Sequence, residues 1–64
     1  MRFVEFPGYG VNAPREYINA DMVQSFHEIS YNGQYGTEIA LDDGRAIRVE
    51  AWPSDVKKAL EAVE

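Results

Sequence analysis

Apolar and polar residues alternate along three segments in the first half of the chain, and this period of two predicts β-strands. The segments are residues 1–6, 15–19 and 22–30. Between the first two, residues 7–14 contain two Pro and two Gly, a composition that predicts a long loop. Residues 19–21 (Asn-Ala-Asp) predict a tight corner, because Asn and Asp side chains hydrogen-bond to nearby backbone groups.

The third predicted strand has no purely apolar face. Its alternation places Val23, Ser25, His27 and Ile29 on one side and Met22, Gln24, Phe26 and Glu28 on the other. We therefore expect either that both faces are partly covered or that a β-bulge between Val23 and Phe26 shifts the register.

The second half of the chain predicts two further strands, each preceded by a turn. The turns contain an Asn-Gly and an Asp-Gly pair, which favour tight hairpins. In order, the chain predicts a turn at 31–36, a strand at 37–43, a hairpin turn at 43–44 and a strand at 45–51.

The last segment predicts a short helix that starts near Ser54. Pro53 cannot continue a strand ladder, Ser54 is a good N-cap, and Asp55 suits the positive end of the helix dipole. Apolar residues then recur at the spacing of one helix face: Val56, Ala59, Leu60 and Val63.

These elements predict a single α+β domain over residues 1–64: a small antiparallel sheet (meander) of four to five strands with one C-terminal helix. The predicted core consists of Val4, Ile18, Val23, Ile39, Leu41, Ile47, Val49, Val56, Leu60 and Val63.

Composition narrows the function classes. The net charge is −5, with only 6 Lys and Arg and no basic run, which disfavours nucleic-acid binding. The chain has no Cys and a single His, so disulfides are excluded and a structural zinc site or other cofactor is not expected. No apolar run approaches the length of a signal peptide or of a membrane span, so we expect a cytoplasmic protein with no membrane partner. A domain of 64 residues buries a small core, and self-association is the remaining way to add stability.

The stretch from Tyr17 to Leu60 resembles the small flagellar-operon proteins of the FlbD family, and similar small phage and bacterial proteins. The shared pattern is an Ile-Asn pair before a corner ending in Val, then Thr, two alternating apolar residues and an Asp-Gly turn. Here these positions are Ile18, Asn19, Val23, Thr37, Ile39, Leu41, Asp43 and Gly44. The resemblance implies the meander fold and implies no catalytic residues.

Residue pairs that could do chemistry have simpler explanations. His27 and Glu28 are adjacent on a strand, so they point to opposite faces and cannot cooperate directly. Asp42 and Asp43 lie in a predicted turn, where turn chemistry explains them. We therefore expect no catalytic site.

Aromatic and arginine residues are the candidates for binding a ligand or partner. Tyr and Trp are enriched at interfaces, and arginine can recognise phosphate or carboxylate. The candidate binding residues are Tyr9, Asn12, Arg15, Tyr35, Arg48 and Trp52. Two alternatives stay open: Trp52 could plug the end of the core, and the arginines Arg15, Arg45 and Arg48 could be solvated partners of Glu side chains.

The long loop predicts the position of one surface. If the first two strands pair antiparallel, Tyr9 and Arg15 lie at one end of the sheet, and we expect them to form a binding surface with Asn12. We expect the turn after the third strand at the opposite end, so that Tyr35 joins this surface only across a subunit boundary.

Two functions remain in view. The first is a non-catalytic small interaction protein that self-associates, most simply as a symmetric dimer, and binds a protein partner. One helix can cover only one face of the sheet, which leaves the other face or an open edge strand for a second copy. The alternative is a phage anti-defence protein that binds and sequesters a small nucleotide-derived signal.

Overall fold

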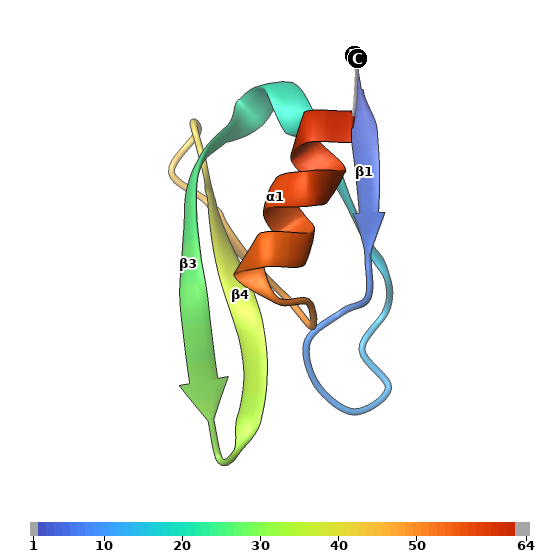
Figure 1. Cartoon of the computed structure of the whole chain (residues 1–64), viewed down its shortest axis with the longest axis vertical. Helices are drawn as coiled ribbons and strands as arrows, with labels where there is room; N and C mark the ends of the chain where they lie inside the picture. Colours follow the sequence, from blue (N-terminus) through green and yellow to red (C-terminus); the bar gives the residue numbers. More distant parts are fainter. Residues whose placement is uncertain (1, 63–64) are drawn as a thin grey trace.

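The computed structural model describes residues 2–62, so the predicted core residue Val63 lies outside the described residues. Five antiparallel strands in two small sheets are followed by one C-terminal helix, which confirms the predicted α+β class (Figure 1). The elements are β1 (Phe3–Phe6), β2 (Glu16–Asn19), a 3-10 turn η1 (Ala20–Met22), β3 (Val23–Tyr31), β4 (Gln34–Leu41), β5 (Ala46–Val49) and α1 (Pro53–Ala62).

The first sheet is the β1–β2 hairpin. Val4 lies opposite Ile18, and both side chains are buried on the same face of the pair. Phe6 is also buried, although the predicted core did not include it. The predicted corner after β2 is η1, where the Asn19 side chain accepts a hydrogen bond from the Asp21 backbone N–H at 3.0 Å.

The second sheet has the order β3-β4-β5, and β3 contains a bulge, one of the two alternatives that its mixed faces left open. The register shifts between Val23 and Ser25, so that Val23 pairs with Leu41 while Phe26 pairs with Ile39. Cross-strand partners share a face, so the bulge turns both Val23 and Phe26 toward the core.

The turn after β3 is shorter than predicted. Asn32 and Gly33 both have positive φ values (51° and 81°), the conformation that closes a two-residue hairpin. Tyr31 therefore pairs directly with Gln34, and β4 begins three residues before the predicted position, with Tyr35 inside the strand.

The helix begins at Pro53, so the assignment of Ser54 as its N-cap is wrong. The Val56 N–H donates to the Trp52 carbonyl at 3.0 Å, which makes Trp52 the residue that precedes the helix. Proline is favoured at the first helical position because its missing N–H would have no partner there.

The core lies where α1, the β1–β2 hairpin and the inner face of the second sheet meet (Figure 1). Of the predicted core, Val4, Ile18, Ile39, Leu41, Val49 and Val56 are buried, while Val23, Ile47 and Leu60 are partly buried against them. The buried Thr37 hydroxyl donates to the Ala51 carbonyl at 2.6 Å, which ties β4 to the segment before α1. No helix within residues 2–62 has the length and apolarity needed to cross a membrane.

Candidate functional site

The loop between β1 and β2 and the turn between β3 and β4 lie at the same end of the molecule (Figure 1). The expectation that they lie at opposite ends is wrong. Each strand reverses the direction of the chain, so the first and third connections fall at one end. The Tyr9 hydroxyl bridges them, since it donates to the Gln34 carbonyl at 2.7 Å. We call this part of the molecule the turn end.

Tyr9 belongs to a cluster on the outer face of the second sheet, the face away from α1. Its ring meets Tyr31 edge-on, with centroids 6.3 Å apart and an interplanar angle of 73°. The Arg48 guanidinium carbon lies 5.4 Å from the Tyr31 ring centroid, and its Nε donates to Glu38 at 3.3 Å. Edge-to-face rings and a cation over a ring are both favourable arrangements. We call these four residues the Tyr9 cluster.

Gly36 makes room for this cluster. A Cβ at Gly36 would lie 2.6 Å from Cδ1 of Tyr9 and 2.5 Å from the Val49 carbonyl oxygen. Glycine inside a strand often marks such a close approach. Gly36 was therefore a sequence signal for this contact. The signal was missed because the sequence pattern placed Gly36 in a predicted turn at 31–36 rather than in a strand.

Tyr35 and Trp52 form a second aromatic group on the opposite, helix-covered side of the sheet. Their rings are stacked, with centroids 5.4 Å apart and 26° between the planes. Tyr35 is 52% exposed and Trp52 53%, so the alternative that Trp52 plugs the core is wrong. We call these two residues the Trp52 pair.

The remaining candidates serve local structure. Arg15 pairs with Glu5, Arg45 with Asp43 at 2.7 Å, and Arg48 with Glu38 at 3.3 Å. The alternative that the arginines are partners of Glu side chains is therefore confirmed for Arg15 and Arg48, whereas Arg45 pairs with an Asp of its own turn. Asn12 is exposed at φ 59°, a left-handed position in the loop that Asn tolerates better than most residues.

The predicted surface of Tyr9, Asn12 and Arg15 is not joined by direct contacts. Within residues 2–62, no hydrogen bond, ion pair or ring contact links Asn12 or Arg15 to Tyr9. The structure instead brings Tyr9 together with Arg48, and Tyr35 with Trp52.

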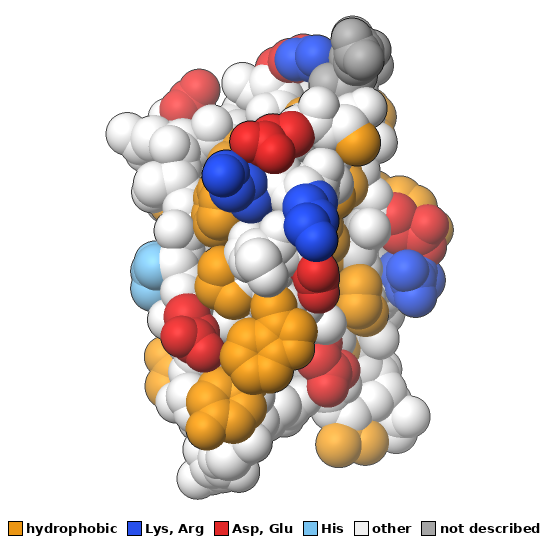
Figure 2. All heavy atoms as spheres, viewed as in Figure 1, with side chains coloured by type: hydrophobic (Ala, Val, Ile, Leu, Met, Phe, Trp, Pro, Cys, Tyr) orange, Lys and Arg blue, Asp and Glu red, His pale blue; other side chains and the backbone are white. Residues whose placement is uncertain are grey.

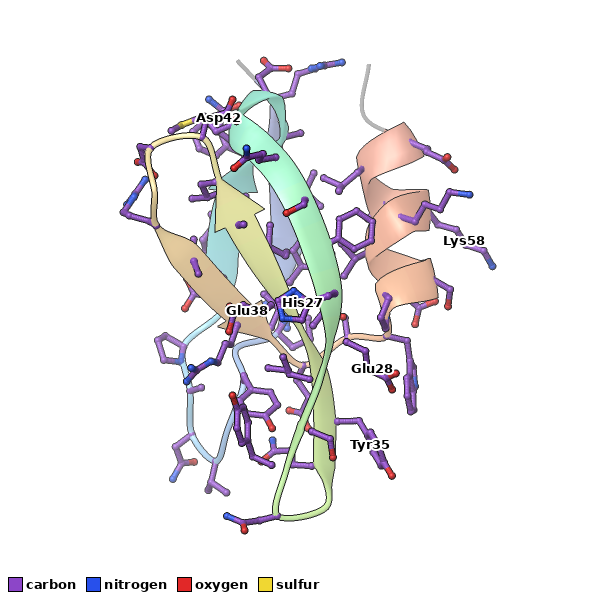
Figure 3. All side chains as sticks on the ribbon, turned by 90° about the vertical axis from the view of Figure 1, so that its left-hand side faces the viewer. His27, Glu28, Tyr35, Glu38, Asp42 and Lys58 are labelled. Atoms are coloured by element: carbon purple, nitrogen blue, oxygen red, sulfur yellow. The ribbon has the colours of Figure 1, made fainter. Side chains whose placement is uncertain are left out.

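A row of three polar side chains crosses the outer face of the second sheet. Glu38 lies between His27 on β3 and Arg48 on β5, because both are its direct cross-strand partners. Figure 3 shows His27 beside Glu38 and Glu28 pointing to the other side. The sequence separates His27 from Glu28 correctly, but only the register identifies Glu38 as the neighbour of His27.

A groove runs between β2 and β5. Its larger part has a volume of about 530 Å³ and its smaller part about 400 Å³, and both are lined by Glu16 and Ile47. The larger part also holds Glu38 and Arg48. Two carboxylates share the lining of this larger part with one guanidinium, so this part is a poor site for phosphate.

Two carboxyls in surface ion pairs have a lowered pKa. The Arg2 side chain, which hydrogen-bonds Asp21, lowers the pKa of that carboxyl, and the Arg45 backbone N–H lowers the pKa of Asp43. Both side chains are partly exposed, Asp21 at 48% and Asp43 at 38%. Residues 2–62 contain no group of three or more side chains arranged to hold a metal ion.

No family model, curated protein or solved structure matches the chain.

Proposed function

We propose that this protein is a non-catalytic interaction protein that self-associates and binds a protein partner through its turn end. One observation carries the proposal: three large aromatic side chains at this end are half exposed. Tyr31 is 51% exposed, Tyr35 52% and Trp52 53%. Half-exposed Tyr and Trp offer large contact areas with a polar group, and such residues dominate binding energy at interfaces.

The aromatic groups are fixed before a partner arrives. Tyr9 is tied to Gln34 by a hydrogen bond, Tyr31 lies between Tyr9 and Arg48, and Trp52 stacks on Tyr35. A side chain that is already held in one rotamer loses little entropy on binding. The contact surface is therefore preorganised.

The chemistry of the Trp52 pair indicates the kind of partner. Figure 2 shows hydrophobic side chains gathered at the turn end with acidic side chains on both sides. An aromatic face attracts a cation, and the protein carries a net charge of −5. The partner is a protein surface with an apolar centre and surrounding Lys or Arg residues.

The nucleotide alternative has less support. A nucleotide-derived signal needs cations for its phosphates, but Arg15, Arg45 and Arg48 are each paired with a carboxylate. Glu16 and Glu38 add negative charge to the groove beside Arg48.

The test is affinity capture from a lysate with matched variants. Trp52→Ser removes the indole ring of the Trp52 pair. The control Tyr17→Ser removes an aromatic ring on β2, outside the turn end, where Tyr17 is 65% exposed. A partner retained by the wild type and by Tyr17→Ser but lost by Trp52→Ser supports the proposal. Trp52 is the only tryptophan, so its fluorescence should shift to shorter wavelength when the purified partner binds.

Two results would contradict the proposal. The first is equal capture by the wild type and Trp52→Ser. The second is a melting temperature that rises with nucleotides or cyclic nucleotides, because ligand binding stabilises the folded state and would favour the sequestration function.

A further inference from the structure

The outer edge of β3 is the longest open strand edge in the described part of the chain. β3 has nine residues and pairs only with β4, whereas β5, at the other edge of this sheet, has four residues. Figure 3 views the molecule from this side and shows no other element in front of the strand.

The register shows which backbone groups point outward. A two-residue turn joins Tyr31 to Gln34, and the pair that flanks such a turn exchanges both backbone hydrogen bonds. Bonded pairs then alternate along the ladder, so the N–H and C=O groups of Phe26, Glu28 and Ser30 point away from β4.

The edge lacks the features that prevent strand pairing. Native proteins protect edges with Lys, Pro, bulges or short strands. Between Ser25 and Tyr31 there is no Lys or Pro, and the register is unbroken. Glu28 is the one carboxylate of this stretch, which contains no Lys or Arg. Two copies can therefore meet along this edge without placing like charges opposite each other, provided that their Glu28 side chains are not directly paired.

We propose that two copies of the chain pair β3 with β3, antiparallel, and join their sheets into one. This rests on the self-association in the proposed function and assigns its surface. The strand can pair with a second copy of itself. In an antiparallel pair related by a twofold axis, each residue whose N–H and C=O groups point outward lies opposite another such residue, so the two can exchange hydrogen bonds. Joining the two sheets adds stability to a domain whose own core is small.

Symmetry and charge select the register. An axis at His27 pairs Ser25–Ile29 of the two copies, within the unbroken part of the register, and sets Phe26 opposite Glu28 of the second copy. An axis at Glu28 would set two carboxylates directly opposite each other, which is destabilising. The axis therefore lies at His27, and both α1 helices lie on the same side of the joined sheet.

The first test is mass against concentration. Light scattering from about 10 μM to about 1 mM should show the wild type rising from 7.3 kDa toward twice that mass. Glu28→Pro removes an outward N–H and leaves the β3–β4 ladder intact, so it should stay folded by circular dichroism and remain at 7.3 kDa.

A second pair of variants keeps the test independent of that proline. His27→Lys places an ammonium group beside Glu38 in the monomer but sets two ammonium groups opposite each other at the axis, so dimerisation should weaken several-fold. The control His27→Gln should dimerise like the wild type. In the dimer, amide exchange at Phe26, Glu28 and Ser30 should slow as concentration rises, while the Ile29 amide should be protected throughout.

The outcomes separate the two proposals. Folded His27→Lys and Glu28→Pro variants that dimerise like the wild type overturn the β3 interface and leave self-association standing. A wild type that stays at 7.3 kDa overturns both the interface and the self-association. Protection of the outer amides only when another protein is added would assign the edge to that protein and overturn pairing between copies. None of these outcomes depends on Trp52.

Discussion

Gly36→Ala tests the packing of the Tyr9 cluster most sharply. The new methyl group would lie 2.6 Å from the Tyr9 ring and 2.5 Å from the Val49 carbonyl oxygen, so the ring, the backbone or both must move. If the ring moves, the hydrogen bond from Tyr9 to Gln34 and the contact with Tyr31 are lost.

The magnitude follows from these contacts. The hydrogen bond contributes about 1 kcal/mol and the ring contact about 0.5–1.5 kcal/mol. Forcing a methyl group into a filled space costs about 1–3 kcal/mol. We expect Gly36→Ala to lower the free energy of unfolding by roughly 2–5 kcal/mol, a large part of the stability of so small a domain.

Urea denaturation measures this cost, and a double-mutant cycle with Tyr9→Ala assigns it to the ring. Gly36→Ala should cost about 1–2 kcal/mol less when Tyr9 is already Ala, because the nearest side chain is gone and the Val49 carbonyl remains. A loss below about 0.5 kcal/mol, the range of ordinary surface substitutions, would refute the reasoning. So would an equal cost in both backgrounds.

Three further predictions concern stability. Thr37→Val leaves the Ala51 carbonyl without its hydroxyl donor and should cost about 1–3 kcal/mol in urea, whereas Thr37→Ser should retain most of the stability; equal losses would exclude the hydrogen bond as the cause. Leu60→Ala, at a partly buried position, should cost about 1–3 kcal/mol, less than a fully buried leucine; a melting temperature unchanged from the wild type would show that this part of α1 is not packed. The hydrogen bond from the Arg45 backbone N–H, together with the ion pair to the Arg45 side chain, holds the pKa of Asp43 below its usual 3.8. The charged carboxyl therefore stabilises the folded state above that pH, and the effect is lost as pH falls through the lowered pKa; the difference between wild type and Asp43→Asn in thermal melts should shrink in acid, and a difference that grew there would contradict this.

Local patterns predict most of the fold because they act through near neighbours. The Asn32-Gly33 pair identifies a hairpin, since both residues adopt positive φ readily. The mixed faces of β3 indicate a bulge, and the structure contains one between Val23 and Ser25. The extent of the turn was predicted less well, because Gly33 and Gly36 flank Gln34 and Tyr35 and favour a loop, whereas pairing with β3 makes these residues part of a strand.

The candidate site was predicted only in part because it depends on contacts between distant segments. Tyr9 and Tyr31 meet because the first and third connections share one end of the molecule and because Gly36 leaves space for a ring. That the two connections lie at one end follows from counting the reversals of the chain. The position of the Tyr9 ring over Gly36 can be known only from the three-dimensional structure. Arg48 likewise meets Glu38 and Tyr31 through strand pairing.

Site-specific photo-crosslinking in cells tests the central claim most directly. A photoreactive amino acid replaces Trp52 at the turn end or, as the control, Tyr17 on β2, both of which are more than half exposed. We predict that the residue at position 52 forms a covalent adduct with another protein, larger than a pair of 7.3 kDa chains, and that the one at position 17 does not. Adducts at position 17 alone, or none at position 52, would contradict a partner bound at the turn end.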